Sequence, residues 1–142
     1  MSDTLKQFPV DQIQLHIDRV TEPFWDAAAE HRLIVPRCAQ CNNYRFPPSS
    51  RCATCHSEKV DWEEVSGRGA VYTFTVLYGG VGPSLSDYVP YAVVAVALDD
   101  VPVRIVANYV GETPDEVRVG LPVEVCWADG DGFTVPRFQE RQ

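Results

Sequence analysis

Two C-x-x-C pairs are the residues of this 142-residue sequence best suited to chemistry. Cys38 and Cys41 form the first pair, and Cys52 and Cys55 form the second pair after ten intervening residues. Zn²⁺ prefers four soft ligands in a tetrahedron, and each C-x-x-C turn presents two thiolates to one ion. The spacing therefore predicts a four-thiolate metal site, with a turn and a short ribbon between the pairs.

The same cysteines could instead form two disulfides or remain free thiols. We favour the metal because nothing marks the sequence as secreted and disulfides are rare in the cytosol. His56 directly follows Cys55 and is a competing ligand, although four cysteines already complete the set. Zinc is the expected metal, and iron is an alternative on ligand type alone, as in rubredoxin.

Four protein ligands leave the ion no open position, so we expect a structural site rather than a catalytic one. Metal binding would supply folding energy that so small a ribbon cannot draw from a hydrophobic core. The sequence contains no G-x-S-x-G, H-E-x-x-H, Walker A or G-x-G-x-x-G motif, and no His lies beside a plausible nucleophile. We therefore predict no catalytic residue, and a binding or scaffolding module rather than a self-contained enzyme.

The composition, with 45% hydrophobic and 23% charged residues, is that of a globular protein. No apolar run reaches the 18 or so residues that a membrane-spanning helix needs, so we expect no membrane partner. The first residues lack the basic and apolar regions of a signal peptide. We expect a cytoplasmic protein.

The formal charge of −8 is unevenly distributed. Four thiolates and one Zn²⁺ would bring it to about −10, since the ligands must be deprotonated. An acidic protein is repelled by nucleic acid, so we expect no nucleic-acid partner. Residues 32–56 contain no carboxylate but four arginines, Arg32, Arg37, Arg45 and Arg51. The ribbon is therefore a basic patch, unless these side chains merely solvate it or pair with acids elsewhere.

A helix is predicted over residues 21–31, where three consecutive alanines favour helical backbone. Thr21 is expected to cap it, and Pro23 is tolerated in the first turn because that N–H has no intrahelical partner. Phe24 and Trp25 are expected to pack the helix onto its neighbours. The alternative is that these aromatic side chains line an acyl groove or contact another subunit.

Residues 1–12 are polar and are predicted to form a loose arm. Strict alternation of apolar and polar residues over 13–17 then favours an extended segment. His31 would lie in the last turn of the predicted helix, where a cation suits the helix dipole.

Strand patterns fill the rest of the chain. Residues 61–65 and 70–78 are predicted to form one long strand, which Gly67-Arg68-Gly69 interrupts as a bulge or bend. Other apolar or alternating runs predict strands over residues 33–35, 91–98, 103–110, 123–127 and 133–138.

A capping box with Thr113 at the N-cap, Pro114 at N1 and Glu116 at N3 predicts one helical turn before the fourth barrel strand. Five strands with a bent first strand and this short helix fit a small closed barrel of the OB type. Cys126 lies in a strand pattern and is expected to be a buried apolar residue.

The longest connection covers residues 79–90 and contains three glycines and two prolines. Long loops in compact domains are often functional or mobile. The flanking Tyr78, Tyr88 and Tyr91 are candidates for contact with a ligand or a partner. The alternative is a plain flexible loop with structural tyrosines.

Taken together, these motifs resemble one known family, DUF35, over about residues 20–138. Besides the cysteine pairs, the matching residues are Phe24-Trp25, Arg37, Phe46-Pro47-Pro48, Trp62, Gly67-x-Gly69-x-Val71-Tyr72-x-Phe74-Thr75, Pro90-Tyr91, Val117-Arg118-Val119-Gly120-x-Pro122-Val123 and Pro136-x-Phe138. C-x-x-C turns of this kind usually have Gly after the second Cys, where this sequence has Asn42 and His56. Asn tolerates the left-handed conformation, whereas His56 suggests a different turn.

The resemblance implies a mainly β fold with an N-terminal helix, a rubredoxin-like zinc ribbon and a C-terminal five-stranded OB-fold barrel. The expected ranges are 1–32 for the arm and helix, 33–60 for the zinc ribbon and 61–142 for the OB-fold domain. It also implies partnership with thiolase-like enzymes, including thiolases, aldolases and acyltransferases, or with hydratases that act on acyl-CoA. Guanidinium groups suit phosphate, so Arg37, Arg45 and Arg51 are candidate contacts for CoA.

Our leading hypothesis is therefore a non-catalytic, zinc-containing accessory subunit of a thiolase-superfamily enzyme acting on acyl-CoA thioesters. The alternative is a nucleic-acid-binding protein, because OB barrels and zinc ribbons both serve that role. A stand-alone acyl-CoA enzyme ranks last.

Overall fold

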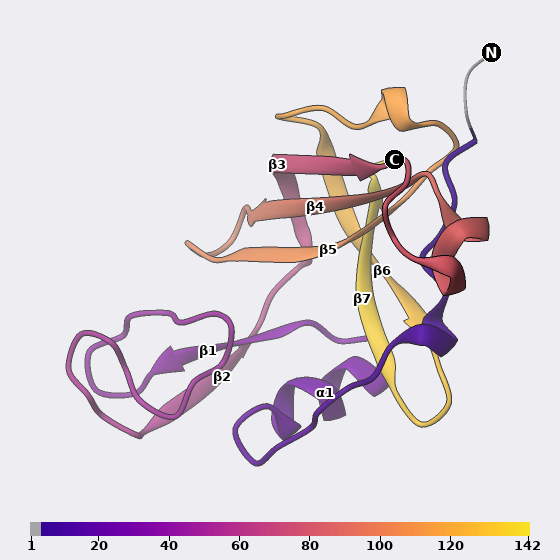
Figure 1. Cartoon of the computed structure of the whole chain (residues 1–142). Helices are drawn as coiled ribbons and strands as arrows, with labels where there is room; N and C mark the ends of the chain where they lie inside the picture. The colour runs from indigo at the N-terminus through magenta and orange to yellow at the C-terminus, as the bar shows by residue number, and fades with distance from the viewer. Residues whose placement is uncertain (1–3) are drawn as a thin grey trace.

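The computed structural model describes residues 4–142, which form a small two-stranded ribbon, one α-helix and a closed five-stranded barrel. Figure 1 shows the ribbon and the helix together on one side of the barrel. The predicted mainly β architecture, with a helix, a ribbon and an OB-type barrel, is confirmed. None of the helices in this part of the chain combines the length and the apolarity needed to cross a membrane.

Strands β1 (Ile34–Cys38) and β2 (Val60–Glu64) form the antiparallel ribbon sheet, in which Cys38 lies opposite Val60. The prediction that residues 61–65 and 70–78 form one long strand is wrong, because β2 pairs with β1 and not with the barrel. Trp62 of β2 lies opposite Pro36. The chain crosses from the ribbon to the barrel directly after β2.

The barrel strands are β3 (Arg68–Leu77), β4 (Tyr91–Leu98), β5 (Arg104–Val110), β6 (Pro122–Asp129) and β7 (Thr134–Glu140). They close in the order β3-β4-β5-β7-β6, with β5 and β7 parallel and the other pairs antiparallel. A register shift between Val71 and Thr73 marks a bulge in β3, which bends this strand.

The barrel core consists of apolar side chains that alternate along the strands. In β4, Val94 and Val96 are fully buried while their neighbours are partly exposed. Tyr109 of β5 and Phe138 of β7 are the largest fully buried side chains. A short 3-10 helix η3 (Pro114–Glu116) precedes β6, and the predicted capping box is present, with the Glu116 carboxylate accepting the Thr113 N–H.

Helix α1 (Glu22–Ala29) is shorter than predicted, and Thr21 does not cap it. Thr21 has helical dihedral angles, and its hydroxyl exchanges hydrogen bonds with Asp18 instead. The Asp18 carboxylate accepts the N–H groups of Val20 and Thr21, which lowers the pKa of Asp18. His31 lies beyond the helix with a φ of 59°, so its predicted place in the last turn is also wrong.

The prediction of a loose N-terminal arm is wrong for the residues that the structure describes. Leu5 is buried, and its N–H donates to Glu112 O at 2.8 Å. The Lys6 N–H donates to Pro90 O at 2.7 Å, and the buried Arg137 guanidinium donates to Phe8 O at 2.6 Å. These contacts hold residues 5–8 against the barrel. The segment ends in the 3-10 helix η1 (Val10–Gln12).

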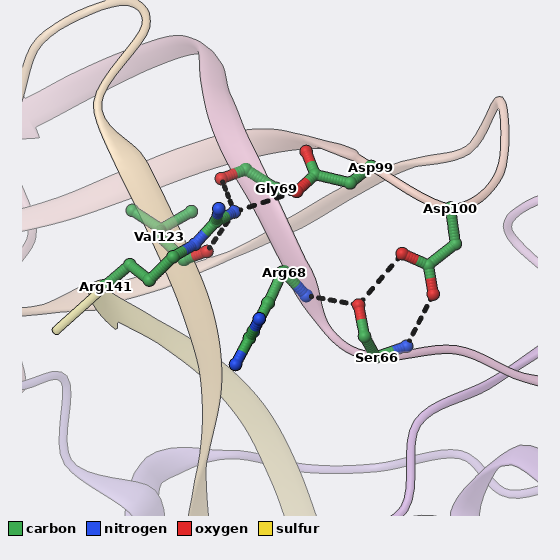
Figure 2. Close-up of polar contacts among 7 residues, drawn as sticks. All are labelled: Ser66, Arg68, Gly69, Asp99, Asp100, Val123 and Arg141. Atoms are coloured by element: carbon green, nitrogen blue, oxygen red, sulfur yellow. Dashed lines mark hydrogen bonds and ion pairs between the residues drawn. The ribbon is translucent and has the colours of Figure 1, made fainter.

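Hydrogen bonds of two residues, Ser66 and Gly67, join the ribbon to the barrel. Figure 2 shows the Ser66 side chain facing Asp100, whose carboxylate accepts the Ser66 N–H at 2.8 Å and the Ser66 hydroxyl at 2.9 Å. The neighbouring Gly67 has a φ of +80° and accepts the Val125 N–H at 2.9 Å. These bonds hold the connection between β2 and β3 against two different barrel segments.

Arg141 closes the barrel beside this connection. Its guanidinium donates to Gly69 O at 2.9 Å and to Val123 O at 3.3 Å, and it pairs with Asp99 at 3.0 Å, as Figure 2 shows. Because Gly69 and Val123 belong to β3 and β6, one side chain bridges the short seam between the first barrel strand and β6.

Candidate metal centre and neighbouring surfaces

The four cysteine sulfurs of the two C-x-x-C pairs converge on one point. All four Sγ atoms lie within 4.8 Å of one another, and the Cys38–Cys55 and Cys41–Cys52 sulfur pairs are each 3.5 Å apart. A disulfide bond measures only about 2.05 Å, whereas Zn–S bonds of about 2.3 Å in a regular tetrahedron place sulfurs about 3.8 Å apart. The geometry suits one four-coordinate ion and not two disulfides.

The two C-x-x-C turns have the same backbone hydrogen bond. The Asn42 N–H donates to Cys38 O at 3.0 Å, and the His56 N–H donates to Cys52 O at 2.9 Å. Asn42 has a φ of 68° and His56 has a φ of 64°, so both adopt the left-handed conformation. The expectation that His56 imposes a different turn is therefore wrong.

Backbone N–H groups point at the first sulfur of each pair. Those of Cys55 and Thr54 lower the pKa of the Cys52 thiol to about 6, and the Thr54 N–H lies 3.4 Å from that sulfur. The N–H groups of Cys41 and Gln40 likewise lower the pKa of Cys38. Hydrogen bonds of this kind stabilise thiolate, which is the form that binds a metal.

The fold places this metal-binding site where it can fix the ribbon. Cys38 ends β1, while the other three cysteines lie in the connection to β2. Cys38 and Cys52 are buried, and Cys41 and Cys55 are partly exposed. An ion held by all four would cross-link the end of β1 to both loops of that connection, and its ligand set would be complete. Zinc, with iron as the substitute, stays a prediction.

The four arginines of the basic patch have different surroundings. Arg32 pairs with Glu30 at 3.0 Å and with Glu64 at 2.9 Å, and Arg51 pairs with Glu58 at 3.1 Å. Arg45 donates from Nε to Ser49 O at 3.0 Å. The alternative of pairing with acids outside residues 32–56 thus applies to Arg32 and Arg51.

Arg37 and Arg45 differ from the other two. The Arg37 Nε and Arg45 Nη1 atoms are buried, and neither has a hydrogen-bond partner among residues 4–142. Tyr44 lies opposite Arg37 in an isolated bridge, and its hydroxyl donates to Glu63. The adjacent Glu64 instead contacts Arg32, so the two carboxylates do not converge.

A cavity of about 700 Å³ separates the ribbon from the end of the barrel. Arg45 and Phe46 line it on the ribbon side, and Leu98, Val103 and Arg104 line it on the barrel side. No carboxylate is among its lining residues. The two guanidinium groups make it suitable for an anionic ligand with an apolar part.

A second cavity, of about 360 Å³, is mostly apolar and lies between helix α1 and strands β5 and β7. Phe24 and Trp25 line it, together with Val106. Phe24 is also buried and packs edge-on against Trp25 and Phe46, with ring centroids 4.9 and 5.7 Å away. The predicted packing role of these aromatics fits this position, and their part in an acyl groove or a subunit contact stays a prediction.

The three tyrosines predicted to contact a ligand or partner are unevenly exposed. Tyr78 is 59% exposed and Tyr88 is 36% exposed, at the two ends of the connection that contains the 3-10 helix η2 (Pro83–Tyr88). Tyr91 is only 8% exposed and packs edge-on against Phe8, with ring centroids 5.3 Å apart. Their contact with a ligand or partner stays a prediction.

Two features were not recognised from the sequence. Arg104 lies over the ring of Tyr72, with its guanidinium carbon 3.8 Å from the ring centroid. His31 stacks on Trp127, and its Nε2 lies 3.0 Å from the Asp129 carboxylate. Both pairs join residues far apart in sequence, so neither leaves a local motif.

Cys126 lies in β6 and is half-buried, and burial raises the pKa of its thiol. The expected buried apolar role is therefore met only in part. A raised pKa keeps the thiol protonated, which makes it a weak nucleophile.

Models of two consecutive domains match the chain. The rubredoxin-like zinc ribbon domain of ChsH2 matches residues 25–61, and the C-terminal OB-fold domain of ChsH2 matches residues 62–128. A solved structure described as an Ltp2-ChsH2(DUF35) aldolase superposes with a TM-score of 0.80 at 34% identity. The match covers 89% of this chain and 98% of that chain.

Two curated proteins extend the comparison. A probable enoyl-CoA hydratase alpha subunit of Thermomonospora curvata is 37% identical over 118 residues, or 82% of this chain. This chain spans only 36% of that protein's length. A DUF35 domain-containing scaffold protein of Methanocaldococcus jannaschii is 33% identical over 106 residues, which cover 70% of this chain and 72% of that protein.

Proposed function

This chain belongs to the DUF35 family, and from that premise we propose that it is a non-catalytic accessory subunit of a thiolase-superfamily enzyme that acts on acyl-CoA thioesters. The observation that carries the proposal is the match, over almost the whole chain, to the ChsH2(DUF35) component of an aldolase structure. The relatives named as a hydratase alpha subunit and as a scaffold protein support the same role.

The geometry of the metal site supports a non-catalytic role. Four converging thiolates would complete the coordination of an ion such as Zn²⁺, so no position is left for water or substrate. The metal would hold the ribbon together, and the reacting residues would belong to the partner.

Gel filtration tests the partnership. The metal-loaded chain is mixed with each thiolase-superfamily enzyme encoded in the same genome, and we expect one of these enzymes to co-elute with it. Absence of any complex, together with no effect on the activity or solubility of these enzymes, contradicts the proposal.

We place the contact with CoA in the 700 Å³ cavity between ribbon and barrel. Arg45 lines this cavity and has a buried Nη1 without a protein partner among residues 4–142. CoA carries phosphates that guanidinium groups bind well, and no carboxylate in the cavity repels them. Arg37 and Arg51, the other two candidates, do not line this cavity.

Titration of the complex with CoA tests this placement. Arg45→Ala should raise the Kd at least tenfold, since a hydrogen bond to a charged group contributes about 1.5–3 kcal/mol. Arg118→Ala removes the same charge from an exposed position outside the cavity and should change the Kd little. An equal loss of affinity for CoA in both variants would show that Arg45 acts only through the net charge of the protein.

A further inference from the structure

The sheet formed by β3, β4 and β5 is depleted of charge. Residues 69–98 contain a single charged residue, Asp87, whereas 23% of the whole chain is charged. Strand β3 begins with the charged Arg68, and strand β5 adds only Arg104. Buried strands are commonly free of charge, but many side chains of this segment are in contact with solvent.

The register shows which side chains of these strands face outward. Thr73, Ala95 and Val106 lie opposite one another in one row across the three strands. Their neighbours Val94, Val96 and Ile105 are buried in the barrel, and successive side chains of a strand alternate between faces. A second outward row contains Thr75, Val93 and Asn108. We call these two rows, with Tyr72, Ala97 and Arg104, the outer face.

The outer face and its rim expose apolar groups. Val106 is 68% exposed and Tyr72 is 51% exposed. The core of a protein–protein interface is typically rich in aromatic and apolar side chains and poor in charged ones. The apolar cavity beside helix α1 shares Val106 and Asn108 with the outer face, so the surface continues to Trp25.

The charges of the outer face argue against a second copy of this chain as its occupant. In a two-fold dimer the same patch meets itself, so Arg104 would face a surface that offers no carboxylate. The ion pairs within residues 4–142 use His31, Arg32, Arg51 and Arg141, which leaves Arg104 without an acidic partner. Two copies would also each bring a formal charge of −8.

We propose that the outer face of β3, β4 and β5 is the surface that docks the catalytic subunit, an inference that rests on the proposed function. The partner would present an uncharged apolar surface to Val106, Ala95 and Tyr72. It would also offer a carboxylate or a backbone carbonyl to Arg104, whose guanidinium the Tyr72 ring already orients.

Val106→Glu tests the docking surface, because it places a charge on the exposed part of the outer face. The matched control is Val119→Glu, since Val119 is 66% exposed but lies outside the three strands. The affinity of each variant for the co-eluting enzyme is measured by titration, with bound metal and thermal unfolding as the checks of folding. We expect Val106→Glu to weaken binding at least tenfold and Val119→Glu to change it less than twofold.

Thr75→Lys provides a second test with the opposite charge on the same face, and it should also weaken binding at least tenfold. Folded Val106→Glu and Thr75→Lys variants that bind as tightly as the wild type overturn the docking surface but leave the proposed function intact. A wild-type chain that binds no such enzyme defeats the proposed function itself. A wild-type dimer that Val106→Glu converts to a monomer overturns our choice of occupant.

Discussion

Gly67 lies against Val125 so closely that a Cβ atom on the glycine would be 2.2 Å from Val125 Cγ1. The same glycine has a φ of +80°, which side-chain-bearing residues rarely adopt. It joins the ribbon to the barrel, because it follows β2 and its carbonyl accepts the Val125 N–H of β6. The position of the metal ribbon relative to the barrel thus depends on a residue without a side chain.

Gly67→Ala should lower the free energy of unfolding by about 3 kcal/mol, the sum of left-handed strain and overpacking. Gly132→Ala is the matched control, since Gly132 has a φ of +79° but open space around its Cα. That variant should lose only about 1 kcal/mol, from strain alone. Urea unfolding measures the free energy of unfolding of both variants. An equal decrease in the two would show that overpacking against Val125 does not destabilise the protein.

The Ser66–Asp100 contact should also stabilise the junction. The Ser66 N–H and then its hydroxyl lower the pKa of Asp100, so the carboxylate is ionised and accepts both bonds at neutral pH. Ser66→Ala should cost about 1 kcal/mol and Asp100→Asn a similar amount. In a double-mutant cycle the two losses should be non-additive by about 0.5 kcal/mol or more, and strict additivity would contradict direct coupling.

Tyr109 should make the protein sensitive to alkali. Burial, followed by the charges of Glu116 and Glu140, raises the pKa of its phenol from 10.0 to about 12. Below pH 10 both the folded and the unfolded state keep this proton. As the pH rises from 10 to about 12, the unfolded state loses the proton first, so the free energy of unfolding falls.

Tyr109→Phe removes this titration and keeps the ring that fills the core. Its free energy of unfolding should therefore decline less steeply than that of the wild type over this pH interval. Urea unfolding of both proteins at several alkaline pH values provides the comparison. Parallel curves would show that the phenol titrates alike in the folded and unfolded states.

Metal content tests the tetrathiolate directly. The purified chain should contain one zinc ion, or one iron ion, by elemental analysis. Cys52→Ser should reduce the metal to well below one equivalent and unfold the ribbon, because metal binding supplies its folding energy. Cys126→Ser is the control outside the cluster and should retain the metal. A full equivalent of metal in Cys52→Ser would rule out four-cysteine coordination.

Local patterns predicted the parts of the structure that local chemistry determines. The spacing of Cys38, Cys41, Cys52 and Cys55 predicted their convergence, because a C-x-x-C turn places its own two sulfurs together. The apolar run of β4 and the capping box at η3 were also found where predicted.

The remaining features depend on partners distant in sequence. Residues 60–64 look like the start of a barrel strand, but β1 offers them an earlier partner and Gly67 turns the chain away. The polar arm is held by Arg137, which follows it by about 130 residues. Thr21 has the side chain of a cap, yet Asp18 engages its hydroxyl instead. These features are determined by tertiary contacts, which a short stretch of sequence does not reveal.

Acyl-CoA turnover by the separated and combined components tests the central claim most directly. The metal-loaded chain alone, its co-eluting partner alone, and the complex are assayed with the same acyl-CoA. We predict no turnover by the chain alone, and a partner whose activity or solubility depends on the chain. Turnover by the isolated chain, abolished by a point substitution outside the four cysteines, would contradict the accessory role and identify this protein as an enzyme in its own right.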